Sequence, residues 1–409
     1  MVPREIQLLQ KPSGVNDNLP NRVEKFRLLE NKILETFKLW GYDEVSVPYI
    51  EYSNIFSVNK ENLLEQQMFQ FNDETGRLVV LRPDFTPSIA RLVATYYKNH
   101  PLPLRLCYSG KIFRANNGNS INEKEQTQVG VELIGGEAPG GDAELVAMAA
   151  ETFQKMEIKN FVICIGNLKF INNLLDCLKV DQSSQSMLIE ALNENNLVQY
   201  QGIIDSLELE SDSKDILKKL PKFRGNKENL NYVREVAGFK PVMNILDELE
   251  NIFKTLESYG LQDKVTFDLS LVRKLDYYTG FIMEGYAEKV GFPLCGGGRY
   301  DKLMDKYGMS LPATGFAFSF DSLIDLVKVK GDALSKLHFG YTQGKRDQAL
   351  EHVKDYRQRG YRVSLELNSQ ELEVSRRKAK EQGADQFYYI GNHGMVKENI
   401  STNSERKDV

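Results

Sequence analysis

The chain changes its hydrophobic pattern twice along its length, and this change limits the folds that it can adopt. Short segments rich in β-branched and aromatic residues run up to residue 167 and resume after residue 262. Between them, residues 168–262 carry apolar residues at helical spacing, as in "NILDELENIFKTLESYG", separated by polar connectors such as "LPKFRGNKEN". A strand-rich region that stops and then resumes predicts one sheet domain interrupted by a helical insertion.

The strand-rich parts predict an α+β domain over residues 1–167 and 263–335, built on a large antiparallel or mixed sheet. Its expected strands include "LPLRLCYSGKIF", "TQVGVELIG", "VTFDLSLVR" and "YTGFIMEGY". Apolar residues spaced by three and four predict a helix over residues 22–40. Pro48, inside the β-rich stretch "YDEVSVPYIEY", is expected at a strand end or a sheet edge, because proline cannot donate to a ladder.

Residues 336–396 show a second alternating pattern. Strand-like "HFGYTQ", "YRVSLEL" and "ADQFYYIG" alternate with helix-like "KRDQALEHVKDYRQRG" and "SQELEVSRRKAKEQG". This order predicts a small α/β unit with parallel strands. Residues 397–409 are predicted to form a polar tail, because they have little apolar surface to bury.

Composition excludes several classes of protein. The 409 residues contain no apolar run close to the roughly 20 residues that a membrane span needs, and the first twenty residues do not resemble a signal peptide. A cytoplasmic location is therefore expected. The formal net charge of −5 argues against a strongly electrostatic nucleic-acid binder. The four cysteines lack the spacing of a zinc site.

Four segments place charged and aromatic residues at strand ends: "LRPDFTPSIAR", "KIFRANNGNSINEKEQTQVGVE", "LVRKLDYYTG" and "CGGGRYDKL". Their carboxylates and amide are suited to hold a cation, their arginines a carboxylate or phosphate, and their paired tyrosines a small ring, so together they suit an amphoteric ligand. The alternative is ordinary ion pairing at strand ends. The candidate residues are Asp84, Arg114, Gln128, Glu132, Arg273, Tyr277 and Tyr278. The glycine run 296–298 by itself predicts a tight turn.

Taken together, these segments resemble those of a known family. "LVRKLDYYTG" followed by "GGGRYDKL" resembles the two signature segments of histidyl-tRNA synthetases, and "KIFRA" with "QVGVE" resembles motif 2 of the class II synthetases. Pro48 falls where that class has its motif 1 proline, at the dimer interface. The resemblance covers residues 11–335 and continues more weakly into the C-terminal unit. It implies a class II aminoacyl-tRNA synthetase-like core around an antiparallel sheet.

The chain departs from the synthetases where ATP would bind. "GFAFSFDSL" matches motif 3, in which the position of Ser322 holds an arginine that binds the γ-phosphate of ATP. Serine lacks that charge, and Asp321, which is predicted to cap the following helix, adds a negative charge that opposes a triphosphate. The motif 2 loop also offers only Lys124 where synthetases carry arginines. We therefore expect poor ATP binding.

The amino-acid half of the pocket is retained. The resemblance implies contacts to histidine from five matching positions, while Asp84 stands where the synthetases use glutamate. The matching residues are Thr86, Gln128, Glu132, Arg273 and Tyr278. The C-terminal unit begins like the synthetase anticodon-binding domain but is truncated. Its residues 337–409 hold 13 Lys and Arg against 11 Asp and Glu, a net of +2, which is little for gripping tRNA.

This combination resembles the regulatory subunits of ATP phosphoribosyltransferase, the first enzyme of histidine biosynthesis. The resemblance implies a non-catalytic homodimer that joins a short-form catalytic subunit in a hetero-oligomer, activates it and responds to L-histidine. No cofactor, metal, tRNA or membrane partner is expected. Two alternatives stay open: a divergent histidyl-tRNA synthetase, and a stand-alone histidine sensor or a transferase acting on another protein.

Overall fold

The computed structural model describes residues 8–56, 68–115, 123–272, 277–327 and 335–400. The chain forms two compact units, residues 1–329 and residues 330–409. Within the described ranges, no helix has both the length and the apolar character that a membrane crossing requires.

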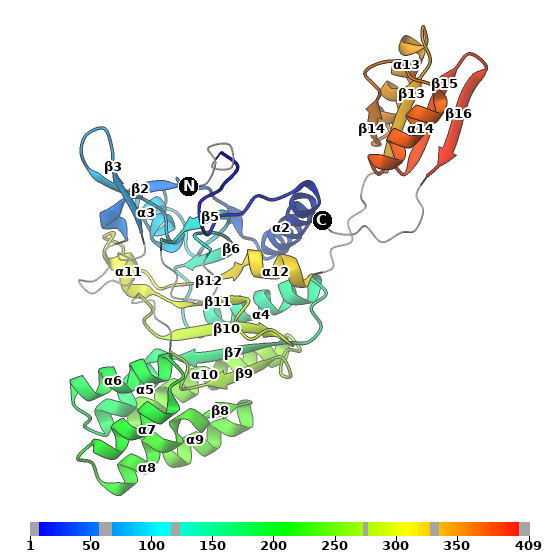
Figure 1. Ribbon diagram of the computed structural model, residues 1–409. Coiled ribbons are helices and arrows are strands. Elements are labelled where there is room, and N and C mark those ends of the chain that lie inside the picture. Colours follow the sequence, from blue (N-terminus) through cyan, green and yellow to red (C-terminus); the bar gives the residue numbers. More distant parts are fainter. Residues whose placement is uncertain (1–7, 57–67, 116–122, 273–276, 328–334, 401–409) are drawn as a thin grey trace, which may run out of the picture. The chain divides into compact units, whose positions relative to one another are not determined.

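A nine-stranded sheet forms the centre of the first unit (Figure 1). Neighbouring strands are antiparallel through the middle of the sheet, and parallel pairs, β1 with β5 and β7 with β9, lie toward its two ends. The predicted mixed sheet of an α+β domain is therefore confirmed. In spatial order the strands are β1 (Asp43–Glu44), β5 (Leu104–Phe113), β6 (Glu125–Ile134), β12 (Ala313–Ser319), β11 (Cys295–Arg299), β10 (Phe281–Ala287), β7 (Phe161–Asn167), β9 (Val265–Asp268) and β8 (Arg224–Gly225).

The two faces of this sheet pack against different helices. On one face, alternate apolar side chains such as Val131 and Phe316 pack with helices α2 (Pro20–Leu39) and α4 (Gly140–Lys155) in the largest core. On the other face, β5 packs with α3 (Thr86–Tyr96) and with α11 (Asp301–Asp305), the short helix that follows β11. Helix α2 matches the helix predicted over residues 22–40.

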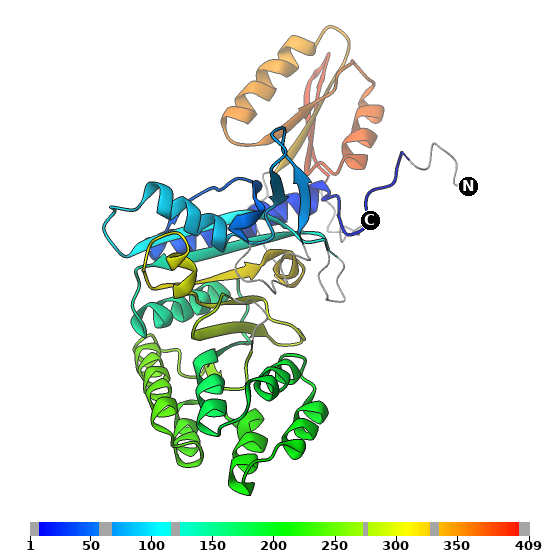
Figure 2. The same cartoon turned by 90° about the vertical axis from the view of Figure 1, so that its left-hand side faces the viewer.

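The helical segment lies between β7 and β9 in the chain, and Figures 1 and 2 show its helices gathered beyond the β7 and β9 end of the sheet. Its apolar residues belong to the same core as one sheet face. The exact boundaries 168 and 262 stay a prediction. The helices are α5 (Leu168–Cys177), α6 (Gln182–Asn193), α7 (Leu197–Ser206), α8 (Ser211–Lys219), η3 (Leu220–Lys222), η4 (Lys227–Asn229), α9 (Leu230–Val236) and α10 (Lys240–Ser258).

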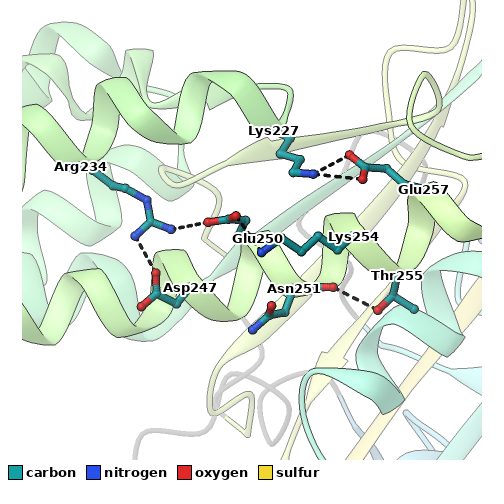
Figure 3. A network of polar contacts seen from close by, with 8 residues as sticks. All are labelled: Lys227, Arg234, Asp247, Glu250, Asn251, Lys254, Thr255 and Glu257. Atoms are coloured by element: carbon teal, nitrogen blue, oxygen red, sulfur yellow. Dashed lines mark hydrogen bonds and ion pairs between the residues drawn. The ribbon is translucent and has the colours of Figure 1, made fainter.

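A surface network of charges fastens α9 and η4 to α10 (Figure 3). Arg234 donates to Asp247 at 2.6 Å and to Glu250 at 2.8 Å, and Lys227 donates to Glu257 at 2.7 Å. Because most of these groups are in contact with water, each pair contributes at most about 1 kcal/mol to stability. The apolar side of α10 therefore does most to hold the helices together.

A separate three-stranded antiparallel sheet contains β2 (Ile50–Tyr52), β4 (Leu78–Leu81) and β3 (Phe69–Asn72), with β4 in the centre. Pro48 lies between β1 and β2, which are close in sequence but belong to different sheets. The proline therefore stands between strand ends, as predicted.

The C-terminal unit has four strands in the order β14 (Arg362–Leu365), β13 (Lys336–Tyr341), β15 (Gln386–Gly391) and β16 (Gly394–Asn399). Its first three strands are parallel and alternate with α13 (Arg346–Gln358) and α14 (Leu372–Glu381), as predicted. Strand β16 was not predicted. It turns back at Gly394 (φ +115°) and pairs antiparallel with β15, so residues 397–399 belong to the sheet and not to a polar tail. The sequence does not indicate this strand because it is short and polar, and pairing with β15 supplies most of its stability.

Candidate functional site

The face of the sheet opposite α2 and α4 carries small and polar residues at its centre. In β6, Gln128, Gly130 and Glu132 alternate with apolar residues that point into the core. Glu132 lies in register with Gly315 of β12, which in turn lies in register with Gly298 of β11. A Cβ atom on Gly315 would be 2.0 Å from Oε2 of Glu132. Glycine is therefore required beside this carboxyl group for steric reasons.

Glu132 is the most deeply buried of the predicted acidic residues, with 1% of its surface exposed. The hydroxyl of Thr86, the first residue of α3, donates to its Oε1 at 2.7 Å, and the hydroxyl of Tyr300 donates to its Oε2 at 2.5 Å. Burial raises the pKa of Glu132 to about 8, the negative charge of Asp84 adds to the rise, and the two hydroxyl bonds oppose it. A cation placed beside Glu132 would favour the ionised form.

Asp84 lies at the start of the same helix and is also buried, with 4% exposed. Tyr277 donates to its Oδ2 at 2.7 Å, and the backbone N–H of Phe85 donates to its Oδ1 at 2.8 Å. The Tyr277 ring packs against the rings of Tyr278 and Tyr300, with centroids 4.9 and 6.1 Å away. Two carboxyl groups held among tyrosines form a site suited to an ammonium or imidazolium group and unsuited to a phosphate.

We call this group the acid–tyrosine cluster. Its members come from segments far apart in the chain and meet on one face of the sheet. They are Asp84, Thr86, Tyr108, Glu132, Tyr277 and Tyr300.

The other predicted residues lie around this cluster. Gln128 is on the same face of β6, and its Oε1 atom is buried with no hydrogen-bond partner among the described residues. Arg114 follows β5, and its Nε donates to the backbone oxygen of Pro83 at 3.1 Å, next to Asp84. The Tyr278 ring lies over Gly298, where a Cβ would be 3.0 Å from its Cδ1. Arg273 lies outside the described residues, so its role stays a prediction.

Sequence reasoning missed two members of the cluster, Tyr108 and Tyr300. The Tyr108 hydroxyl lies over Gly130, 2.6 Å from where a Cβ would be, and both tyrosines are almost fully buried. Strand alternation could have found Tyr108, because it shares the face of β5 with Leu106, whose register partner is Glu132. Tyr300 directly follows the glycine-rich strand, within the segment "CGGGRYDKL".

The glycine run 296–298 is part of strand β11, so the prediction of a tight turn is wrong. Two of its glycines are needed for close packing: a Cβ on Gly297 would be 2.1 Å from the backbone oxygen of Gly315, and one on Gly298 would be 2.5 Å from that of Phe281. Arg299, at the end of this strand, pairs with buried Asp142 of α4 at 2.8 Å. This ion pair fixes the end of β11, and Tyr300 is the next residue in the chain.

The predicted helix cap at Asp321 is also wrong. Helix α12 (Phe320–Leu326) is preceded by Ser319, and no side chain caps it. Asp321 instead accepts a hydrogen bond from the backbone N–H of Thr127 at 2.6 Å. Ser319, the last residue of β12, pairs with Gln128. Thr127 lies one residue beyond that pair, and the Asp321 carboxylate accepts its N–H in place of a further strand residue. Ser322 is partly buried in the first turn of α12.

Comparisons with known proteins agree on the family. The family model for histidyl-tRNA synthetase matches residues 14–323. The ATP phosphoribosyltransferase regulatory subunit of Geobacter sulfurreducens is 34% identical over 87% of this chain and 82% of its own length. The regulatory subunit of Moorella thermoacetica is 34% identical over 92% of this chain and 96% of its own length.

Solved structures give the same answer for the fold. A Bacillus halodurans protein described as an ATP phosphoribosyltransferase regulatory subunit/histidyl-tRNA synthetase superposes with a TM-score of 0.86, at 31% identity over 94% of this chain and 99% of that one. Histidyl-tRNA synthetase from Nostoc sp. PCC 7120, at 18% identity, has a TM-score of 0.80 over 95% and 96% of the two chains, which supports the class II synthetase fold alone. By its sequence and its fold, the chain belongs to the family of ATP phosphoribosyltransferase regulatory subunits, which is built on the histidyl-tRNA synthetase architecture.

Proposed function

We propose that this chain is a non-catalytic regulatory and activating subunit of ATP phosphoribosyltransferase that works in histidine biosynthesis and takes part in feedback by L-histidine. The observation that carries the proposal is a contrast between two regions that the resemblance to synthetases assigns to one active site. The acid–tyrosine cluster is held together by hydrogen bonds, while Ser322 stands where, by the resemblance, a synthetase has the arginine that binds ATP. A site whose side chains suit histidine, but which lacks the arginine needed to use ATP, fits a protein that senses histidine and does not activate it.

In this proposal free histidine occupies the cluster. Glu132 faces its α-amino group, Arg273 its carboxylate, and Tyr278 with Asp84 encloses the imidazole ring. Thr86, Tyr277 and Tyr300 orient the two acids through the hydrogen bonds described above, and Gln128 has a buried amide oxygen left to offer to a donor on the ligand. Arg114, which lies beside the Asp84 segment, adds positive charge for the carboxylate.

We expect the purified chain to raise the turnover of a short-form ATP phosphoribosyltransferase catalytic subunit when the two are mixed. The catalytic groups for phosphoribosyl transfer would be on the partner, so activation requires assembly. The assay compares phosphoribosyl-ATP formation by the catalytic chain with and without this protein. Unchanged turnover would refute the regulatory assignment. Histidine-dependent pyrophosphate exchange at millimolar ATP would instead support a divergent histidyl-tRNA synthetase.

We further propose that the chain forms a homodimer through the region of Pro48, within a hetero-oligomer with catalytic subunits. One face of the three-stranded sheet gathers two rows of apolar residues, and three of them are well exposed: Ile50 at 50%, Phe71 at 42% and Tyr52 at 37%. An exposed apolar face of this kind typically marks an interaction surface. The rows are Ile50, Leu81 and Phe69, and Tyr52, Val79 and Phe71.

The Phe71→Asp variant is expected to be a monomer by light scattering at concentrations where the wild type is a dimer, because the interface would have to bury an unpaired charge. Leu78→Asp is the matched control: Leu78 is 44% exposed on β4, but its side chain points to the opposite face of the same sheet. It should remain a dimer. A Phe71→Asp protein that remains a dimer would place the interface elsewhere. A wild type that is a monomer would refute the homodimer.

A further inference from the structure

Arg82 is an unusual buried charge. Only 2% of its surface is exposed, and among the described residues no carboxylate pairs with it. Its guanidinium donates instead to backbone oxygens of two separate segments: Nη1 to Val47 at 2.5 Å and to Pro48 at 3.2 Å, and Nε to Lys111 at 2.8 Å. Burial lowers its pKa. Burying a charge without an ion pair is costly, and here the charge of nearby Glu51 and two aromatic rings help the carbonyl contacts to offset that cost.

The guanidinium is the second layer of a four-layer stack. Its Cζ lies 4.4 Å from the centroid of the Tyr49 ring and 4.0 Å from that of the Phe85 ring. The Phe85 ring in turn stacks on Tyr108, with centroids 4.1 Å apart and planes inclined by 16°. The stack therefore runs from Tyr49, which is 53% exposed, to Tyr108, which is 2% exposed.

The inner end of this stack belongs to the acid–tyrosine cluster. Tyr108 is a member of it, and the backbone N–H of Phe85 holds the carboxylate of Asp84. Gly110 leaves space for the stack, because a Cβ there would be 2.7 Å from Nη2 of Arg82 and 3.0 Å from Phe85. The outer end lies beside Pro48, whose backbone oxygen Arg82 also holds. The guanidinium therefore contacts both the Pro48 segment and the Phe85 ring beside the cluster.

We propose that Arg82 is a positioning residue for the histidine pocket and that the exposed ring of Tyr49 holds it in place from the surface. That histidine is the ligand rests on the proposed function above. The stack and its contacts are features of the structure and do not depend on that assignment. Arg82 does not touch the ligand. It fixes Phe85, and through Phe85 both Asp84 and Tyr108, while Tyr49 closes the stack on its outer side.

The test measures histidine affinity by calorimetry on the full-length chain, together with the melting temperature. Tyr49→Leu removes the outer ring at an exposed position, so the protein should fold. The variant loses the cation–π contact between Tyr49 and Arg82. One such contact changes an equilibrium constant by about two- to fivefold, and we expect histidine affinity to fall by that factor. Tyr49→Phe keeps the ring and should bind like the wild type. Arg82→Lys keeps the charge but loses the planar stack, and should weaken binding more than Tyr49→Leu.

Phe71→Asp controls for oligomeric state, because Phe71 lies on the apolar sheet face and outside the stack. Loss of affinity in Tyr49→Leu, with Tyr49→Phe and Phe71→Asp unchanged, supports the proposal. Wild-type affinity in Tyr49→Leu, or an equal loss in Phe71→Asp, overturns it and leaves the pocket assignment intact. A wild type that binds no histidine overturns the pocket assignment, and this inference falls with it.

Discussion

Replacing Glu132 with glutamine is expected to weaken histidine binding on the order of ten- to a hundredfold. A hydrogen bond to a charged group typically contributes about 1.5–3 kcal/mol, and the variant loses the charge while keeping the shape of the side chain. Glu125→Gln is the matched control. Glu125 lies at the start of the same strand but is partly exposed and pairs with Lys111 at 3.3 Å. Calorimetry on both variants should show a loss in the first only.

The same residue predicts how binding depends on pH. Burial chiefly raises the pKa of Glu132 to about 8, so most of the protein without ligand holds a proton there at pH 7. A bound cation favours the ionised form, so binding releases this proton, and affinity should rise between pH 6 and pH 8 and level off above. Glu132→Gln should lose this contribution, while the titration of histidine itself affects both proteins equally. Parallel pH profiles for the two proteins would show that Glu132 does not face the cation.

Replacing Arg299 with methionine is expected to lower the free energy of unfolding by about 3–5 kcal/mol, because it leaves Asp142 buried without its ionic partner. The two side chains are 5% and 2% exposed and 2.8 Å apart. Urea denaturation at pH 8 measures the loss. Adding Asp142→Leu should recover much of it, since an apolar pair in place of a buried ion pair is often close to neutral. A loss of less than about 1 kcal/mol would mean that this pair behaves like a surface ion pair.

This variant also has a predicted pH dependence. Burial already raises the pKa of Asp142 to about 6, although Arg299 opposes the rise. Without the guanidinium, the folded-state pKa rises further above the unfolded value. A carboxyl group with a raised folded pKa contributes stability at low pH that is lost as the pH rises. The defect of Arg299→Met should therefore be smaller at pH 5.5 than at pH 8, and a constant difference would exclude Asp142 as its cause.

Much of this protein could be predicted from local patterns. The alternation in β6, the helical spacing in α2 and the alternating strands and helices of the C-terminal unit are each contained within one stretch of sequence. Such patterns reflect the geometry of a single helix or strand, so they can be recognised without knowing its neighbours. The motif segments were equally local, and they led to the family that the comparisons show.

Tertiary structure decided which residues meet. Strands β1 and β2 are close in the chain yet join different sheets, and β16 is a strand only because β15 offers it an edge. The glycine run became a strand because Gly315 of β12 lies beside it in register, and Glu132 lies one strand further on. Tyr108 and Tyr300 entered the cluster by long-range pairing, which no single segment encodes. The free energy of such pairing comes from burial shared among distant segments, and for that reason local patterns predicted the elements but not the full set of residues around Glu132.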